Sequence, residues 1–134
     1  MNLSDYQESK ELQQAGAPIA VGDSVFYVRR LGTKESQEAL KNIRQQLYGP
    51  FHKMADTDNN RLYGHWLTEY GVTGWTGVDD QDGALEYSKE AARNIFTNPD
   101  YFLSLNDLLI SAALRFENYL HDEAQADGDK LEKK

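Results

Sequence analysis

The chain has 134 residues, which fits one domain that buries roughly two thirds of its unfolded surface. It contains no cysteine, so disulfides and thiolate metal ligands are excluded, and a reducing compartment is expected. Its 22 acidic and 14 basic side chains give a net charge of -8, which disfavours binding to nucleic acid and to anionic membranes. No secretory signal and no apolar run of roughly 20 residues is visible, so a soluble protein with protein partners is expected.

The N-terminal third is predicted to hold an arm, a hairpin and a helix. Residues 4–14 have a helix-forming composition and a possible capping pair in Ser4 and Gln7, but few apolar contacts, which predicts a frayed or docking arm. Residues 19–31 are rich in β-branched and aromatic side chains around the turn Gly22-Asp23, which predicts a hairpin. Thr33 is then expected to cap a helix that runs to residues 49–50, with Phe51 and Met54 continuing its apolar face.

The middle of the chain predicts a loop, a helix and a second hairpin. Residues 56–60 are polar and predict a loop, and the aromatic-rich residues after them predict a helix that ends near Gly71. Two short apolar segments, 75–78 and 84–87, flank an acidic turn closed by Gly83, which supplies the positive φ that a tight turn requires. Ser88 is the expected N-cap of a short helix that Asn98 and Pro99 terminate.

The last helix, predicted over residues 99–121, is expected to be the longest and most apolar. Besides one broad apolar face it carries a second apolar stripe, formed by Leu103, Ile110 and Leu114 at i, i+7 and i+11. Two interpretations stay open: a central helix packed on both flanks, or a surface for self-association or client binding. Residues 122–134 are charged and nearly free of large apolar groups, which predicts a disordered tail.

Candidate reaction centres are weak. Residues 56–67 open like a calcium-binding loop, but Arg61 stands where glycine is needed and Leu67 where a glutamate should bind the ion. Asp79 and Asp82 resemble an acid and base pair, yet a solvated turn does not raise a carboxyl pKa as such catalysis requires. The three histidines lack metal-ligand spacing, and the two tryptophans are expected in the core. No enzyme activity, metal or cofactor is therefore predicted.

Residues 63–119 resemble the tail assembly chaperones of long-tailed, siphovirus-type bacteriophages. The resemblance rests on an aromatic helix, a turn, a short helix and a final helix ending in FENY. The turn has the pattern Trp-Gly-Val-acidic-Gly, and its residues are Trp75, Gly77, Val78, residues 79–82 and Gly83. The hairpin at residues 21–31 and Thr33 also resemble the N-terminal half of that family.

The resemblance implies a non-enzymatic chaperone in the host cytoplasm that is absent from the mature virion. Its implied partners are the tape-measure protein, which it solubilises, the major tail-tube protein, which it helps to recruit, and further copies of itself in a homo-oligomer. Neither nucleic acid nor a membrane is an implied partner. The resemblance also implies a longer form, made by translational frameshifting, with a second domain after residues 130–134.

The sequence thus predicts a mainly α fold: one small helical domain over residues 1–121 with one or two short β-hairpins, followed by the disordered tail. Leu103, Ile110 and Leu114 are the predicted protein-binding residues. The alternative function is a small acidic adaptor or inhibitor that binds a host or phage protein through the turn at residues 79–82, and it predicts steep salt sensitivity. A hydrolase that uses the carboxylates of that turn is a third possibility and requires a pocket that raises their pKa.

Overall fold

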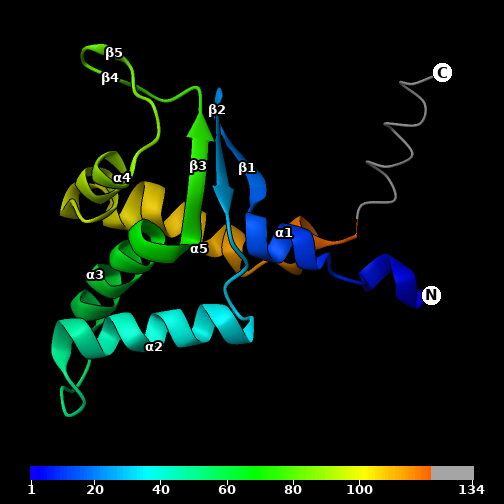
Figure 1. Ribbon diagram of the computed structural model, residues 1–134, viewed down its shortest axis with the longest axis horizontal. Helices are drawn as coiled ribbons and strands as arrows, with labels where there is room; N and C mark the ends of the chain where they lie inside the picture. Colours follow the sequence, from blue (N-terminus) through cyan, green and yellow to red (C-terminus); the bar gives the residue numbers. More distant parts are fainter. Residues whose placement is uncertain (122–134) are drawn as a thin grey trace.

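A computed structural model describes residues 1–121, and Figure 1 shows helices arranged around a small sheet. The predicted tail at residues 122–134 lies outside the described residues. In chain order the elements are η1 (Leu3–Tyr6), α1 (Lys10–Ala15), β1 (Ala17–Val21), β2 (Ser24–Val28), α2 (Lys34–Tyr48), α3 (Asp56–Trp66), η2 (Leu67–Gly71), β3 (Val72–Thr76), β4 (Asp79–Asp80), β5 (Gly83–Ala84), α4 (Lys89–Phe96), η3 (Pro99–Tyr101), η4 (Phe102–Asn106), α5 (Asp107–Ala113) and η5 (Phe116–Tyr119). Of the short helical turns, η2 and η4 are π-helical and the others are 3₁₀.

The predicted mainly α fold class is wrong, because the domain is mixed α/β, with 56% helix and 17% strand. The hairpin of β1 and β2 around Gly22 is confirmed, but β3 also pairs with β2, so one antiparallel sheet has the order β1-β2-β3. Trp75 therefore lies opposite Phe26 in the sheet and does not pair with residues 84–87. The second hairpin is smaller than predicted and consists only of β4 and β5. Local patterning could not reveal this long-range pairing.

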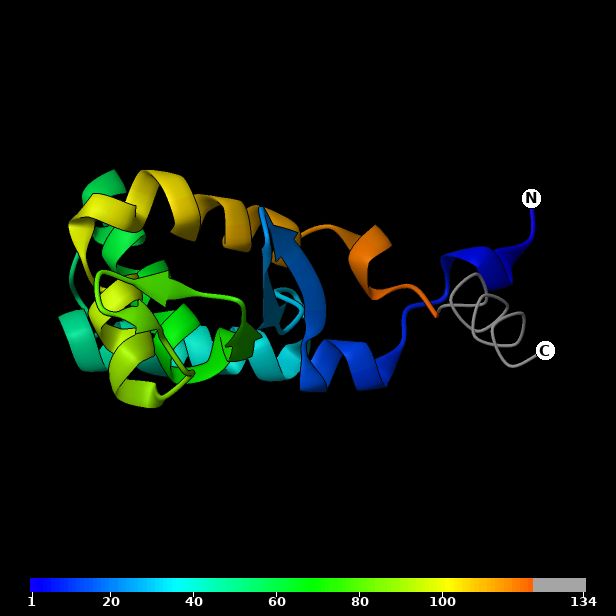
Figure 2. The same ribbon diagram turned by 90° about the horizontal axis from the view of Figure 1, so that it is seen from above.

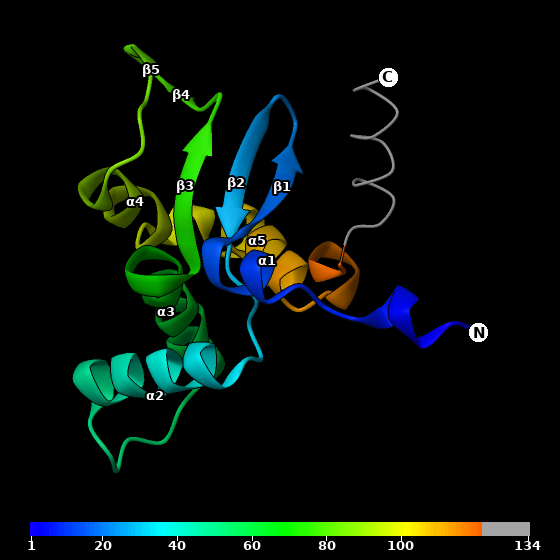
Figure 3. The same cartoon turned by 45° about the vertical axis from the view of Figure 1, so that its right-hand side comes forward.

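The sheet has one buried and one exposed face. Successive side chains of a strand point to opposite faces, so alternate residues of β1 and β2 enter the core. Figure 3 shows the three strands side by side with α5 behind them. The buried side chains of the sheet are Ala17, Ile19, Phe26, Val28, Val72 and Trp75. Trp75 and Phe26 also contact Phe96 of α4, with ring centroids 6.2 and 6.4 Å away, so α4 closes the aromatic end of this core.

Helix α2 follows the prediction, and the predicted helix that ends near Gly71 is present as α3 and η2, but α3 begins earlier than predicted. The Thr33 side chain accepts a hydrogen bond from the Ser36 N–H, which confirms the predicted cap of α2. The predicted loop at residues 56–60 is instead the start of α3. The Asp58 carboxylate accepts hydrogen bonds from the Ala55 N–H, at 3.0 Å, and from His52, and these bonds lower its pKa. Acidic side chains are favourable in the first turn of a helix, which explains why this polar segment is helical.

The two tryptophans and one exposed phenylalanine complete the comparison for these segments. Trp66 and Trp75 are buried in the core, as predicted. The Trp66 indole N–H donates to the Ser36 carbonyl, which satisfies its polar atom. Phe51, in contrast, does not extend the apolar face of α2, because its side chain is 97% exposed in the turn between α2 and α3.

The predicted helix over residues 99–121 is interrupted. A helical run of η3, η4 and α5 extends from Pro99 to Ala113, and it crosses one side of the sheet in Figure 2. The Asn98 side chain accepts a hydrogen bond from the Asp100 N–H and so caps the start of this run. Arg115 then adopts an extended conformation, with φ -88° and ψ 115°, which ends the run before the 3₁₀ turn η5. The longest single α-helix among residues 1–121 is consequently α2, with 15 residues.

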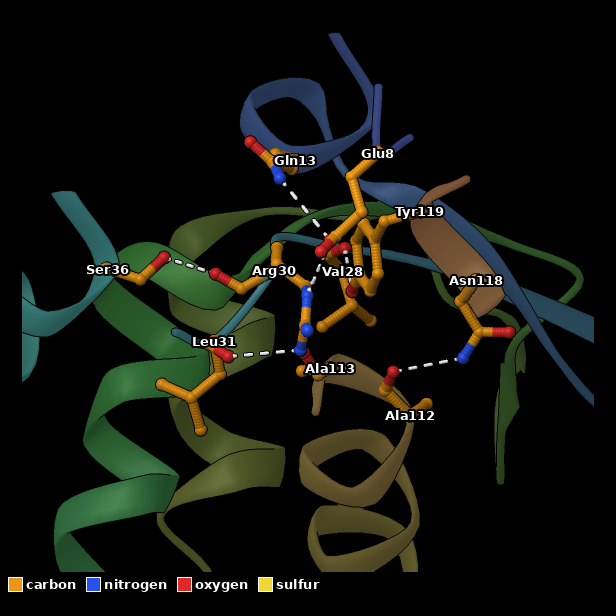
Figure 4. A network of polar contacts seen from close by, with 10 residues as sticks. All are labelled: Glu8, Gln13, Val28, Arg30, Leu31, Ser36, Ala112, Ala113, Asn118 and Tyr119. Atoms are coloured by element: carbon orange, nitrogen blue, oxygen red, sulfur yellow. Dashed lines mark hydrogen bonds and ion pairs between the residues drawn. The ribbon is translucent and has the colours of Figure 1, made fainter. Parts of the chain in front are cut away.

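Arg30, just after β2, supplies donors to the end of α5. Its guanidinium donates to the Ala113 carbonyl at 3.0 Å and to the Glu8 carboxylate at 2.8 Å (Figure 4). The Leu31 N–H also donates to the Ala113 carbonyl, at 2.9 Å. The last carbonyls of a helix have no partner within the helix, so these donors allow α5 to end inside the protein.

Two side chains of η5 complete the same network. The Asn118 amide donates to the Ala112 carbonyl at 2.9 Å, and the Tyr119 hydroxyl donates to the Val28 carbonyl at 2.8 Å (Figure 4). Burial raises the pKa of Tyr119 far above its usual value, so the hydroxyl keeps the proton that it donates. The chain turns at residues 114–115 because these bonds require η5 to lie back against the end of α5 and the sheet.

The N-terminal arm docks against the last described residues. The predicted capping pair of Ser4 and Gln7 does not form: the two residues are joined by a backbone hydrogen bond from the Gln7 N–H to the Ser4 carbonyl, and the Asn2 and Ser9 side chains cap η1 and α1. The Ser9 N–H donates to the Tyr119 carbonyl, and the His121 N–H donates to the Gln7 carbonyl at 2.7 Å. Of the two expected behaviours, docking is therefore the one observed.

Replacing Gly64 by alanine is expected to destabilise the fold. A methyl group at Gly64 in α3 would lie 2.3 Å from the Phe96 carbonyl oxygen, which belongs to the backbone and cannot rotate away. Overpacking of this kind lowers the free energy of unfolding by about 1–3 kcal/mol, measurable by urea denaturation. Gly74→Ala is the control, because its methyl group would meet only Tyr27 at 3.9 Å. Equal stability of the two variants would contradict the close contact of α3 with the end of α4.

Candidate protein-binding surface

The structure separates the three predicted protein-binding residues. Leu103, in η4, is 81% exposed, and Leu114, just after α5, is 56% exposed. Ile110, in α5, is only 8% exposed and belongs to the hydrophobic core. The interpretation of a helix packed on both flanks therefore holds for Ile110, whereas Leu103 and Leu114 are accessible, and binding through these two residues stays a prediction. The accessible surface comprises Leu103 and Leu114. The prediction that Ile110 belongs to this surface is wrong, because its side chain is buried.

The π-helical turn η4 explains why Ile110 is buried. The prediction placed each residue 100° after the one before it, which puts Leu103 and Ile110 on the same face. A π-helical turn closes its hydrogen bonds from i to i+5 and so inserts one extra residue into the helix. That insertion rotates all later residues by roughly 100° relative to Leu103 and turns Ile110 toward the core.

Further apolar side chains are exposed on and just after the helical run. Tyr101 and Leu108 are exposed on the same run as Leu103, and Phe116 is exposed two residues after Leu114. The Phe116 ring lies 6.1 Å from the ring of Tyr6, which is also exposed and belongs to the N-terminal arm. Sequence reasoning assigned most of these residues to the buried face of one long helix. The interruption at Arg115 is what leaves Phe116 at the surface.

A groove runs between the edge strand β1 and α5. It has a volume of about 390 Å³, and its lining residues include Pro18 and Ala20 of β1, Leu108 and Ser111 of α5, and Arg115 just after α5. Pro18 has no backbone N–H, so an added strand would find fewer partners along this edge than along an ordinary strand. The groove is thus better suited to side-chain contacts than to extension of the sheet.

The acidic turn projects from the body of the protein. Figure 1 shows the hairpin of β4 and β5 standing beyond the end of β3 and above α4. Asp79, Asp80 and Asp82 are all exposed on it. The Asp80 carboxylate accepts a hydrogen bond from the Asp82 N–H at 2.8 Å, a contact that stabilises the turn. Carboxylates in this setting are accessible to a charged partner.

The three histidines lie in different surroundings. His52 contacts the Asp58 carboxylate, and His65 is partly buried in α3, where burial lowers its pKa. His121 is exposed beside the N-terminal arm. Across residues 1–121, no three His, Asp or Glu side chains converge in a way that could hold a metal ion. The same residues include no helix that is long and apolar enough to cross a membrane.

The features with the clearest capacity for binding are thus exposed apolar side chains on a mixed α/β domain. A family model described as YdaY prophage protein matches residues 30–130, and the chain belongs to this family of prophage proteins. Neither the curated proteins nor the solved structures include a match to the chain. The family confirms the phage origin that the resemblance implied. Its description names no role in tail assembly.

The different burial of the three predicted residues has a measurable consequence. Ile110→Ala is expected to lower the free energy of unfolding by about 2–5 kcal/mol, because it leaves a cavity in the core. Leu103→Ala and Leu114→Ala are each expected to change it by no more than about 0.5 kcal/mol, because both side chains are largely solvated. Urea denaturation of the three variants measures these differences. A loss at Leu103 as large as that at Ile110 would contradict the assigned exposure.

Proposed function

We propose that this prophage protein is a non-enzymatic tail assembly chaperone. In the host cytoplasm it binds and solubilises the tape-measure protein, helps to recruit the major tail-tube protein, and forms homo-oligomers. The observation that carries the proposal is the exposure of Leu103 on the helical run, and of Leu114 at its end, in a prophage protein. Large apolar side chains that remain accessible after a domain has folded are available to an apolar client.

The size of this surface fits a reversible chaperone. Burying one leucine side chain contributes roughly 1.5–3 kcal/mol, so Leu103 and Leu114 together contribute about 3–6 kcal/mol before the costs of association. That is too little for a permanent complex, but several copies bound along one long client, and in contact with each other, would gain avidity. Weak individual contacts also allow the chaperone to be displaced when tube subunits assemble.

The charge of the chain supports the same role. With a net charge of -8, a coat of these molecules repels other coated clients and stays in solution. A helical client such as the tape-measure protein satisfies its own backbone hydrogen bonds and presents apolar side chains in stripes. Apolar contacts on the helical run would therefore cover the apolar stripes of that client, and the charge on the remaining surface would keep the complex in solution.

A second candidate function is an acidic adaptor or inhibitor of a host or phage protein. The observation that favours it is the projecting hairpin, on which Asp79, Asp80 and Asp82 are exposed. Binding through these carboxylates would weaken steeply as salt rises, because exposed charges are screened over about 8 Å at physiological ionic strength. Binding through Leu103 and Leu114 would depend little on salt.

The chaperone proposal is tested by co-purification with the tape-measure protein of the same prophage. The double variant Leu103→Gln/Leu114→Gln is expected to lose at least about tenfold in recovered client, because each lost apolar contact removes roughly 1.5–3 kcal/mol. Ile110 is left unchanged so that the core is intact. Repeating the experiment at low and high salt separates apolar binding from binding through the acidic hairpin.

Phe51→Gln is the matched control, because it also removes an exposed apolar side chain but lies in the turn between α2 and α3. It is expected to recover as much client as the unchanged protein. Full recovery of the client by the double variant would contradict a role for Leu103 and Leu114. Recovery that disappears in high salt would favour the adaptor.

A further inference from the structure

A cleft separates the acidic hairpin from the helices beside it. Its volume is about 500 Å³, which lies within the range of known ligand clefts. One wall is the hairpin of β4 and β5, and the other is formed by α4 and by the start of the last helical run. Its apolar lining residues are Val78, Leu85, Ile95, Tyr101 and Leu105, and its polar lining residues are Asp79, Asp80, Gln81 and Asp82.

The hairpin wall is fixed to the core through Trp75. The indole N–H of Trp75 donates to the Leu85 carbonyl at 2.8 Å, and its ring packs edge-on against Tyr87 at 5.0 Å. The Leu85 N–H in turn donates to the Val78 carbonyl, which closes the base of the hairpin. The Ser24 hydroxyl donates to the Gly77 carbonyl at 2.6 Å from the opposite side. The cleft is therefore largely formed before any partner arrives.

The charge of the cleft is one-sided. Three carboxylates lie along the hairpin wall, and no lysine or arginine from the described residues 1–121 lines the cleft. None of the three carboxylates takes part in the ion pairs found among residues 1–121. An occupant with cationic side chains would gain favourable interactions at this wall, while its apolar side chains would contact Tyr101 and Leu105.

We propose that this cleft binds an amphipathic α-helical segment of a partner protein, with one apolar ridge flanked by lysine or arginine side chains. The apolar residues of the cleft would contact the ridge, and the carboxylates would contact the flanking cations. An extended peptide fits less well, because β4 and β5 have two residues each and offer few backbone partners. A helix needs none, since its backbone hydrogen bonds are internal.

This inference goes beyond the chaperone proposal, because Leu103 and Leu114 do not line the cleft. The two surfaces can therefore be disabled independently. The apolar contacts of the cleft supply most of the affinity, whereas exposed carboxylates mainly set the orientation and the rate of association. Binding at the cleft is thus expected to have an electrostatic component that salt removes and an apolar component that salt leaves.

The test uses the full chain and two synthetic helical peptides. Both carry leucines along one face; the first has lysines flanking that face, and the second has glutamates in the same positions. Fluorescence anisotropy at low and high salt measures the affinity of each peptide. The lysine peptide is expected to bind, to bind roughly tenfold more weakly at high salt, and to shift the amide NMR signals of residues 78–85 and 95–105.

Asp79→Asn/Asp82→Asn is expected to weaken binding of the lysine peptide by roughly tenfold at low salt and to flatten its salt dependence. Tyr101→Gln is expected to weaken binding at both salt concentrations. Glu35→Gln/Glu38→Gln removes two charges from exposed sites on α2 and is the matched control, with an affinity unchanged within about twofold. This control separates binding at the cleft from attraction to the net negative charge.

Three results would overturn the proposal: no binding of the lysine peptide, equal binding of the glutamate peptide, or equal weakening by the control and the hairpin variants. Each variant is first checked by circular dichroism. The Leu103→Gln/Leu114→Gln variant is expected to bind the lysine peptide normally. A variant that loses tape-measure binding but binds the peptide normally is impaired only at Leu103 and Leu114. A variant that loses peptide binding but still binds the tape-measure protein is impaired only at the cleft. The two proposals are therefore decided separately.

Discussion

The C-terminal end of α5 needs hydrogen-bond donors, and much of the domain is arranged around the groups that supply them. Arg30 and Leu31 donate to the Ala113 carbonyl, and Asn118 donates to the Ala112 carbonyl. Donors that precede α5 in the chain and a donor that follows it therefore meet at its C-terminal end. The Glu8 carboxylate neutralises Arg30 and brings the N-terminal arm to the same place. An unpaired buried carbonyl costs more than an ordinary hydrogen bond contributes, so these bonds fix where α5 stops. The exposure of Leu114 follows from that stop.

Local signals in the sequence predicted the elements whose ends are set locally. The turn at Gly22-Asp23 and the caps Thr33 and Ser88 are all present, because a capping side chain accepts a hydrogen bond from a backbone N–H only a few residues further along the chain. The start of α3 differs from the prediction, because the polarity of residues 56–60 alone indicates a loop. The carboxylates there favour a helix N-terminus, and that preference was the available signal.

The remaining differences depend on contacts between distant segments. The pairing of β3 with β2 joins residues about fifty positions apart, and no local pattern distinguishes it from a hairpin. Of the candidate site, the exposure of Leu103 and Leu114 was within reach of periodicity, whereas the burial of Ile110 depends on the π-helical turn η4. The sequence indicates the acidic turn but not the cleft beside it. Tyr101 and Leu105 line that cleft only because α4 and the last helical run pack together.

The pairing of residues 7–9 with residues 119–121 also affects how the domain is made. These contacts have nearly the largest sequence separation possible within the described chain, and closing so long a loop is entropically costly until other parts have formed. During synthesis, the β1–β2 hairpin and α2 leave the ribosome long before Tyr119 does. The hydrogen bonds of Tyr119 with Ser9 and Val28 can therefore form only after η5 has been synthesised.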